Sequence, residues 1–162
     1  MANSISSNPQ LMKIPRRVKA TLIALGVLAL AIQLIPVSRS NPPVIKELVW
    51  DSPMTRAFAR RACYDCHSNE VTWPWYSHVA PASWLVASDV KNARERFNFS
   101  EIGADDRVGI LVKQINTGTM PPMSYLALHS AARLAAQEKS AYLAGLRRSF
   151  ELSGIGSDQP KQ

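Results

Sequence analysis

The sequence predicts an all-α fold, because apolar residues recur at helical spacing in several segments and no long alternating run indicates a strand. The first segment begins at Ser52 and Pro53, which are typical of a helix N-cap and of the first helical position. A helix is expected to run from there through Phe58 and Ala62. It leads directly into the two cysteines of the chain, so this element carries a candidate chemical motif at its C-terminal end.

Three further helices are predicted from apolar stripes, each of which would form one buried face. The first of them starts at Pro81. The next follows Asp105 and Asp106, whose charges suit a helix N-terminus, and ends before Gly118. The last spans about residues 135–150. The three stripes are Ala82, Val86, Val90, Ala93 and Phe97, then Val108, Leu111, Val112 and Ile115, and finally Leu143, Leu146 and Phe150 with Tyr142 beside them.

Residues 20–37 form an uncharged, mostly apolar stretch of eighteen residues, which is just long enough to cross a bilayer as a helix. The basic residues Lys13, Arg16, Arg17 and Lys19 precede it. Because positive residues tend to stay in the cytoplasm, residues 1–19 are expected inside and everything after about Arg39 outside. A retained anchor in the cytoplasmic membrane is the favoured interpretation. A cleaved signal peptide is the alternative, since Ala29-Leu30-Ala31 fits a small-x-small cleavage site.

The rest of the chain is expected to form one domain with a short extension at each end. Residues 38–50 are predicted to be a Pro-rich tether, residues 51–152 the folded domain, and residues 153–162 a flexible tail. Outside the basic N-terminus the chain has 15 basic and 12 acidic residues. This small excess does not form a basic binding face, so no nucleic-acid partner is expected.

The two cysteines belong to the pattern Cys63-Tyr64-Asp65-Cys66-His67, a C-x-x-C-H sequence that is the attachment signature of c-type haem. Residues three and four apart share one face of a helix, so both thiols and the imidazole would project together. The sulfurs can then bond the vinyl side chains of the porphyrin while His67 reaches the iron. The sequence therefore predicts a small cytochrome c-like helical domain around one covalent haem c, held by Cys63, Cys66 and His67.

Two other interpretations of the cysteine pair have weaker support in the sequence. An exported C-x-x-C could form a disulfide or the redox centre of a thioredoxin-like protein, but that fold needs a β-α-β pattern around the motif. The flank before the motif is helical and the flank after it is rich in aromatic residues. A zinc site would need four ligands at tight spacing, and His78 and His129 have neither a partnering cysteine nor a second close histidine.

A second axial ligand is needed if the iron is six-coordinate, and methionine is the usual partner of histidine in electron-carrying cytochromes c. The loop from Thr117 to Met123 contains a turn-forming glycine and two prolines, which make it stiff enough to hold a thioether. Met120 is the preferred distal ligand. The alternatives are Met123, His78, His129 or an open position. Met54 precedes the cysteines on their own helix and would reach the distal face poorly.

Aromatic and charged residues near the motif have both a functional and a structural interpretation. Trp73, Trp75 and Tyr76 are expected either to line a haem edge, with an N–H or O–H free to bond a propionate, or simply to pack in their loop. The charged residues Lys91, Arg94, Glu95 and Arg96 lie off the apolar stripe of their helix. They are expected to form a solvated face rather than a site for a propionate or an acidic partner.

Together these stretches resemble the bacterial haem-binding domain family, of monohaem cytochrome c type. The matching stretches are Cys63 to Asn69, Trp73 to Tyr76, Asn98 to Ser100, Met120 to Pro122, Ser124-Tyr125 and Leu128-His129. The resemblance covers about residues 51–150 and implies a single haem c and an N-terminal membrane segment. It also implies Cys63 and Cys66 as thioether donors, His67 as proximal ligand and Met120 as distal ligand. Thr119 departs from the family, which tends to have an acidic residue before this methionine.

The favoured hypothesis is a membrane-anchored periplasmic carrier of single electrons, which meets redox partner proteins and is not an enzyme. A fixed histidine and methionine pair keeps the iron coordination alike in both oxidation states. The competing class is a haem-based sensor or a peroxidase-like enzyme, in which the distal position is open or labile. A third class, an assembly or docking protein that uses haem structurally, is also compatible with these residues.

Overall fold

The computed structural model describes residues 15–103 and 108–155, and the chain divides into two compact units between Pro36 and Val37. In the first unit, helix α1 (Arg16–Ala31) continues into the 3-10 turn η1 (Ile32–Leu34). This segment is long and apolar enough to cross a membrane, although a signal sequence passes the same test. It begins and ends a few residues before the stretch expected from hydropathy, because arginine and lysine are good helix formers whereas Pro36 disfavours helix in the residue before it.

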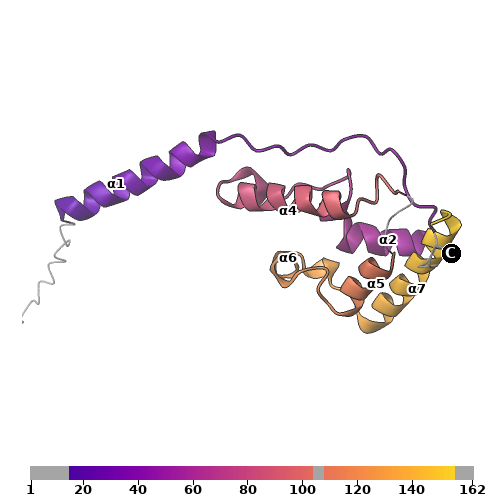
Figure 1. Cartoon of the computed structure of the whole chain (residues 1–162). Helices are drawn as coiled ribbons and strands as arrows, with labels where there is room; N and C mark the ends of the chain where they lie inside the picture. The colour runs from indigo at the N-terminus through magenta and orange to yellow at the C-terminus, as the bar shows by residue number, and fades with distance from the viewer. Residues whose placement is uncertain (1–14, 104–107, 156–162) are drawn as a thin grey trace, which may run out of the picture. The chain divides into compact units, whose positions relative to one another are not determined.

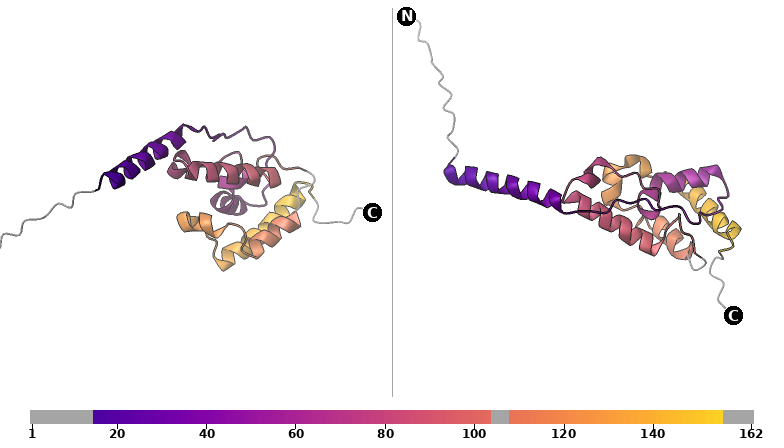
Figure 2. Two further views of the ribbon diagram at one scale, coloured as in Figure 1. Left: turned by 60° about the vertical axis from the view of Figure 1, so that its left-hand side comes forward. Right: turned by 90° about the horizontal axis from the view of Figure 1, so that it is seen from above.

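The second unit consists of helices joined by loops. Its elements are α2 (Pro53–Ala62), α3 (Tyr64–His67), η2 (Trp75–His78), α4 (Ala82–Arg96), α5 (Val108–Asn116), α6 (Met123–Leu128), η3 (Ser130–Ala132) and α7 (Ala136–Leu152). Within the described residues there is no strand, only an isolated parallel bridge between Lys46 and Glu101. The all-α prediction is therefore confirmed. Figures 1 and 2 show α5 and α7 side by side, with α6 set apart from that pair.

The core lies where α7 packs against α2 and α5. Helix α2 begins as the sequence predicts, because the Ser52 hydroxyl accepts a hydrogen bond from the Thr55 amide at 3.2 Å. Helices α2 and α7 approach closely at Gly145, where a Cβ atom would collide with the Thr55 side chain. The buried side chains of this core include Phe58, Ala59, Tyr64, Phe99, Val112, Ile115, Tyr142, Leu146 and Phe150.

The stripes predicted on α5 and α7 face this core. The buried members are Val108, Val112 and Ile115 on α5, and Tyr142, Leu146 and Phe150 on α7. Leu111 and Leu143 are only half-buried, so Tyr142 takes the place that the sequence predicts for Leu143. Gly118 follows α5 with a φ of 74°, a left-handed conformation that glycine adopts readily. The preceding Asp105 and Asp106 lie outside the described residues.

Helix α4 differs from its predicted stripe. Val90 is buried as expected, and Ser83 is buried although it lies off the stripe. The other stripe residues, Ala82, Val86, Ala93 and Phe97, are half-buried. Helix α4 packs against α3 and η2, whereas the core is built by α2, α5 and α7, so the α4 stripe is left partly open beside the cysteine motif.

Residues 39–47, which the sequence places in a Pro-rich tether, are extended but are fastened along the second unit. The Arg39 guanidinium donates to the Ser77 carbonyl at 3.1 Å, and the Asn41 amide group donates to the Val71 carbonyl at 2.9 Å. Further along, the amides of residues 45 and 46 both donate to the carbonyl of residue 100. Within the segment predicted as a Pro-rich tether over residues 38–50, residues 39–47 therefore form a strap that belongs to the domain.

Arg94 also holds this strap, which corrects the expectation that it faces water. Its guanidinium donates to the Ser68 carbonyl at 2.8 Å and to the Ser40 carbonyl at 3.0 Å. These bonds leave Arg94 half-buried between the strap and the end of the cysteine motif. Lys91 and Glu95 are exposed as expected, with a nitrogen-to-oxygen distance of 3.9 Å.

The C-terminal boundary of the domain lies further on than the sequence predicts. Ser153, expected in a flexible tail over residues 153–162, accepts a hydrogen bond from the Val49 amide at 2.9 Å. Ile155 is 3% exposed and belongs to the core. The packed domain therefore extends beyond residue 152 to at least Ile155. Residues 156–162, like residues 1–14, lie outside the described part of the chain.

Candidate functional site

The cysteine motif forms a helical turn of its own. Helix α2 ends at Ala62, and Cys63 has a φ of −129°, which separates α2 from α3. The Cys63 carbonyl accepts hydrogen bonds from the amides of Cys66 (3.1 Å) and His67 (2.9 Å). The sequence predicts that the helix from Ser52 continues into the motif, but the motif is instead a separate turn after α2. Residues three and four apart still share one face.

Both motif cysteines are free thiols in a half-buried environment. Burial raises the pKa of Cys63 and of Cys66 to about 11 each. The Tyr142 hydroxyl lies 3.6 Å from the Cys63 sulfur. Redox-active cysteine pairs have a lowered thiol pKa, so these two thiols lack the electrostatics of a thioredoxin-type centre. Among the residues that the structure describes, no group of three or more His, Cys, Asp or Glu side chains is placed to hold a metal ion.

One backbone contact orients the His67 ring. Its Nδ1 atom lies 3.0 Å from the carbonyl oxygen of Phe97, which can only accept, so Nδ1 carries the proton. Nε2 then keeps its lone pair, which is the form of imidazole that binds a metal. Burial lowers the pKa of His67 and favours this neutral form. A carbonyl acceptor on the second ring nitrogen is a common way to fix a ligating histidine.

A buried polar cluster, Ser68, Asn69, Asn98 and Ser100, fixes the segment that supplies this carbonyl. The Asn98 side chain donates to the Asn69 side-chain oxygen at 2.9 Å, and the Asn69 amide donates to the Ser100 hydroxyl at 2.9 Å. These bonds lock the residues after His67 to the residues after α4. Both stretches stand in the sequence resemblance, but only the three-dimensional contacts show that they orient the His67 ring.

Met120 is half-buried in the loop between α5 and α6. The amides of Thr119 and Met120 both donate to the Gln114 carbonyl near the end of α5, at 3.0 and 3.2 Å. Pro122 then precedes α6 as its N-cap residue. The loop is therefore tied to α5 by its backbone and is continuous with α6, while its two prolines limit backbone freedom.

A side-chain hydrogen bond joins α6 to the cysteine motif. The Tyr125 hydroxyl donates to one carboxylate oxygen of Asp65 at 2.8 Å. The other oxygen of Asp65 accepts from the Thr72 amide at 3.2 Å. This bond links the helix that follows Met120 to the turn that carries His67. Sequence reasoning assigns no role to Asp65 or Tyr125, although both stand in stretches that carry the family resemblance.

The alternative distal ligands are placed differently. Met123 is 67% exposed at the start of α6, and His78 is exposed at the end of η2. His129 is half-buried, but both of its ring nitrogens are engaged. Its Nδ1 lies 3.1 Å from the Tyr125 carbonyl, and its Nε2 lies 3.3 Å from the Tyr76 hydroxyl. Among the four candidate side chains that the structure describes, Met120 is the one that is partly buried and whose donor atom makes no recorded hydrogen bond.

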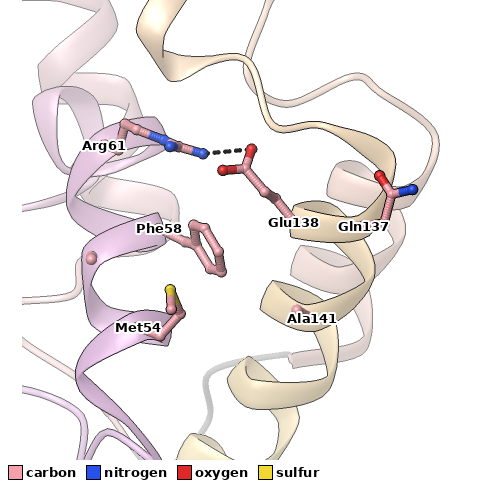
Figure 3. A pocket seen from close by; sticks show the side chains of 7 residues that line it. Met54, Phe58, Arg61, Gln137, Glu138 and Ala141 are labelled. Atoms are coloured by element: carbon pink, nitrogen blue, oxygen red, sulfur yellow. Dashed lines mark ion pairs between the residues drawn. The ribbon is translucent and has the colours of Figure 1, made fainter.

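Met54 lines a groove between α2 and α7 (Figure 3). The other lining residues are Ala57, Phe58, Arg61, Gln137, Glu138 and Ala141. An ion pair of 2.8 Å between Arg61 and Glu138 spans the two helices there. Neither motif cysteine nor His67 lines the groove.

Two buried indole N–H groups have no hydrogen-bond partner among the described residues. They belong to Trp73, in the loop after the motif, and to Trp84, near the start of α4. A buried donor without a partner is costly and indicates a water or ligand acceptor. Trp75 is instead 78% exposed, and Tyr76 is bonded to His129. Of the three aromatic residues expected near a haem edge, Trp73 offers a buried free donor; Trp84 has no place in the sequence prediction.

A family model described as a haem-binding domain matches residues 27–148, a span that includes the cysteine motif, the strap, Met120 and most of α7. No curated protein and no solved structure matches the chain.

Proposed function

The chain belongs to the haem-binding domain family and is a haem protein, and we propose that it is a c-type cytochrome that carries single electrons. In this proposal one haem c is bonded to Cys63 and Cys66. His67 is the proximal ligand of the iron and Met120 the distal ligand. When bound, the haem iron supplies a one-electron couple, and no other substrate is needed.

The residues present fit such a group. His67 offers a neutral Nε2 atom with a lone pair, and both thiols lie on the same helical turn. The partly open apolar stripe of α4 belongs to a helix that packs against that turn, so it suits the face of a porphyrin. The buried N–H of Trp73 suits a propionate oxygen.

The observation that carries the proposal is the contact between His67 Nδ1 and the Phe97 carbonyl. It sets the ring tautomer and orientation that metal ligation needs. A solvated histidine would not need this arrangement, in which a buried polar cluster holds the carbonyl in place. The geometry therefore supports a ligand role for His67 beyond what the C-x-x-C-H spacing alone supports.

An electron carrier is favoured over a sensor or a peroxidase-like enzyme, because distal chemistry on oxygen or peroxide uses a nearby proton-handling side chain. The remaining histidines do not offer one. His78 is exposed, and both nitrogens of His129 are engaged by Tyr76 and by the Tyr125 carbonyl. A methionine ligand in a stiff loop also suits electron transfer, since the coordination of the iron would then change little between the two oxidation states.

We assign the domain to the periplasmic side of the cytoplasmic membrane, with α1 as a single-pass anchor. The support is the apolar segment Arg16–Leu34 and the basic residues at its start, which tend to stay in the cytoplasm. Redox partner proteins on the periplasmic side would then exchange electrons with the haem.

The visible absorption spectrum tests the ligand assignment. The chain is matured with a cytochrome c assembly system and compared with Met120→Ala and with the matched control Met123→Ala, in both oxidation states. We expect low-spin spectra for the wild type and for Met123→Ala, and a high-spin, carbon monoxide-binding form for Met120→Ala. A wild type that is already high-spin and binds carbon monoxide readily would overturn the carrier in favour of an open distal site.

A further inference from the structure

We propose that Asp65 and Tyr125 form a positioning pair that fixes the Met120 loop to the haem-attachment turn and thereby keeps the distal position closed to other ligands. The inference rests on the proposed function, because it assumes a haem with Met120 as its distal ligand. In this role neither residue binds the cofactor itself. They act through the position of α6, which follows the Met120 loop directly.

Helix α6 depends on such a fastening because it is short and sparsely packed. It has six residues, of which Leu126 is buried. Among the helical elements that the structure describes, α6 lies close to η3 alone, and Figure 1 shows it apart from α5 and α7. A helix of this length is not stable by itself in water, so its position must come from tertiary contacts.

The bond between Tyr125 and Asp65 is the shortest side-chain link from α6 to the rest of the domain. The phenol donates to the Asp65 carboxylate at 2.8 Å, and hydrogen bonds to a carboxylate are stronger than those between neutral groups. The Thr72 amide holds the second carboxylate oxygen at 3.2 Å, which restricts the orientation of the acceptor. Both residues are half-buried, so water competes less than at an exposed pair.

The Asp65 carboxylate, which accepts this bond, lies on the turn that carries the proposed haem-attachment residues. Asp65 lies between the two cysteines, on a turn that covalent attachment would make rigid. Tyr125 lies five residues after Met120, with Pro121 and Pro122 between them. The chain between Met120 and Tyr125 is therefore short and stiff, and a shift of α6 would move the methionine with it.

A second contact supports the same helix less directly. The His129 ring stacks on the Tyr125 ring, with centroids 4.1 Å apart and an interplanar angle of 12°. His129 Nε2 lies 3.3 Å from the Tyr76 hydroxyl, which belongs to η2. His129 comes directly after α6, so its longer hydrogen bond to Tyr76 holds the end of the helix that is further from Met120. We therefore expect it to contribute less to the position of the distal methionine.

The expected effect follows from competition for the iron. An external ligand binds only the fraction of molecules in which the methionine is dissociated, so its apparent affinity rises with that fraction. Loss of one hydrogen bond to a charged group should raise carbon monoxide affinity about tenfold in Tyr125→Phe, because the methionine dissociates more often. The far-red absorption band of the sulfur-to-iron bond should weaken in the same variant.

The matched control is Tyr64→Phe. Tyr64 is the other residue between the cysteines, and its hydroxyl donates to Glu47 at 2.6 Å, so this change also removes a tyrosine-carboxylate bond. Glu47 lies on the strap, so the bond between Tyr64 and Glu47 does not involve α6. We expect Tyr64→Phe to lower stability while leaving carbon monoxide affinity within about twofold of the wild type.

A double-mutant cycle with Asp65→Ala completes the test on the matured full chain. The double variant should bind carbon monoxide no more tightly than either single variant, because both changes remove the same bond. Additive effects, or a Tyr125→Phe variant with wild-type affinity and an intact far-red band, would overturn the positioning role. Met120→Ala in parallel separates the two proposals: if it leaves the spectrum and affinity unchanged, the distal ligand itself is wrong.

Discussion

The thiols of the cysteine motif hold their protons at neutral pH, because burial raises the pKa of Cys63 and Cys66 to about 11. This state sets them apart from redox-active pairs, whose thiolates form near neutral pH. At the same turn, burial lowers the pKa of His67 and keeps its imidazole neutral. Protonated thiols beside a neutral imidazole are the state from which thioether attachment and iron ligation would start.

The raised thiol pKa predicts how the haem-free protein reacts with iodoacetamide. Only the thiolate reacts, so a pKa of about 11 means that the rate climbs about tenfold per pH unit through pH 8 to 10 and levels off only near pH 11. The protein unfolded in urea should instead level off near pH 8.5, the value of a free cysteine. A folded sample, with helix content checked by circular dichroism, that levels off near pH 8.5 would contradict the burial of these thiols.

Local spacing is enough to predict the motif residues, because Cys63, Cys66 and His67 lie within one helical turn. The partner of the His67 ring could not be predicted in this way, since the Phe97 carbonyl is thirty residues away and depends on tertiary packing. The same holds for Asp65 and Tyr125, which are sixty residues apart. A backbone carbonyl leaves no signal in side-chain identity, so the sequence cannot point to it.

At the scale of the elements, the buried polar cluster of Ser68, Asn69, Asn98 and Ser100 joins the segment after α3 to the segment after α4. Asn98→Ala should destabilise the domain by about 2 kcal/mol, because it removes the partner of the Asn69 side-chain oxygen and leaves that buried group unsatisfied. Urea denaturation measures this change. The control is Asn92→Ala, an exposed asparagine on α4 bonded to Ser88, which should shift stability by no more than about 0.5 kcal/mol.

An equal loss for Asn92→Ala and Asn98→Ala would mean that the cluster is not buried as described. The cluster also limits how the His67 ring can turn, because it holds the residues around the Phe97 carbonyl. Asn98→Ala should therefore change the spectrum of the matured protein as well as its stability.

The cap residues Ser52 and Pro53 predict α2, and periodicity predicts α5 and α7 well, because each of these helices buries one apolar face in a common core. It predicts the extent of α4 but not its burial, since most of its apolar stripe lies beside the cysteine motif instead of in that core. The strap could not be predicted either. Proline content is typical of a tether, whereas its fastening depends on Arg94 and Arg39 reaching backbone carbonyls far along the chain.

At the scale of the whole molecule, an apolar helix joined to a separate folded unit predicts that the protein is found in the membrane fraction of the cell. If α1 is a retained anchor, the full chain should stay in the membrane fraction after alkaline carbonate washing, because that treatment removes only peripheral proteins. Replacing residues 15–35 with a cleavable signal peptide should release a soluble periplasmic haem protein. A soluble product of the full-length gene whose N-terminus begins just after Ala31 would instead establish the cleaved signal peptide.

The central claim, a haem bonded through the two cysteines, is tested most directly by intact-mass measurement of the matured chain under denaturing conditions. We predict that the mass exceeds that of the polypeptide by one haem, and that Cys63→Ala combined with Cys66→Ala abolishes the increase. A native protein that carries haem but loses all of it on denaturation would contradict the account, because the cofactor would then be held without thioether bonds.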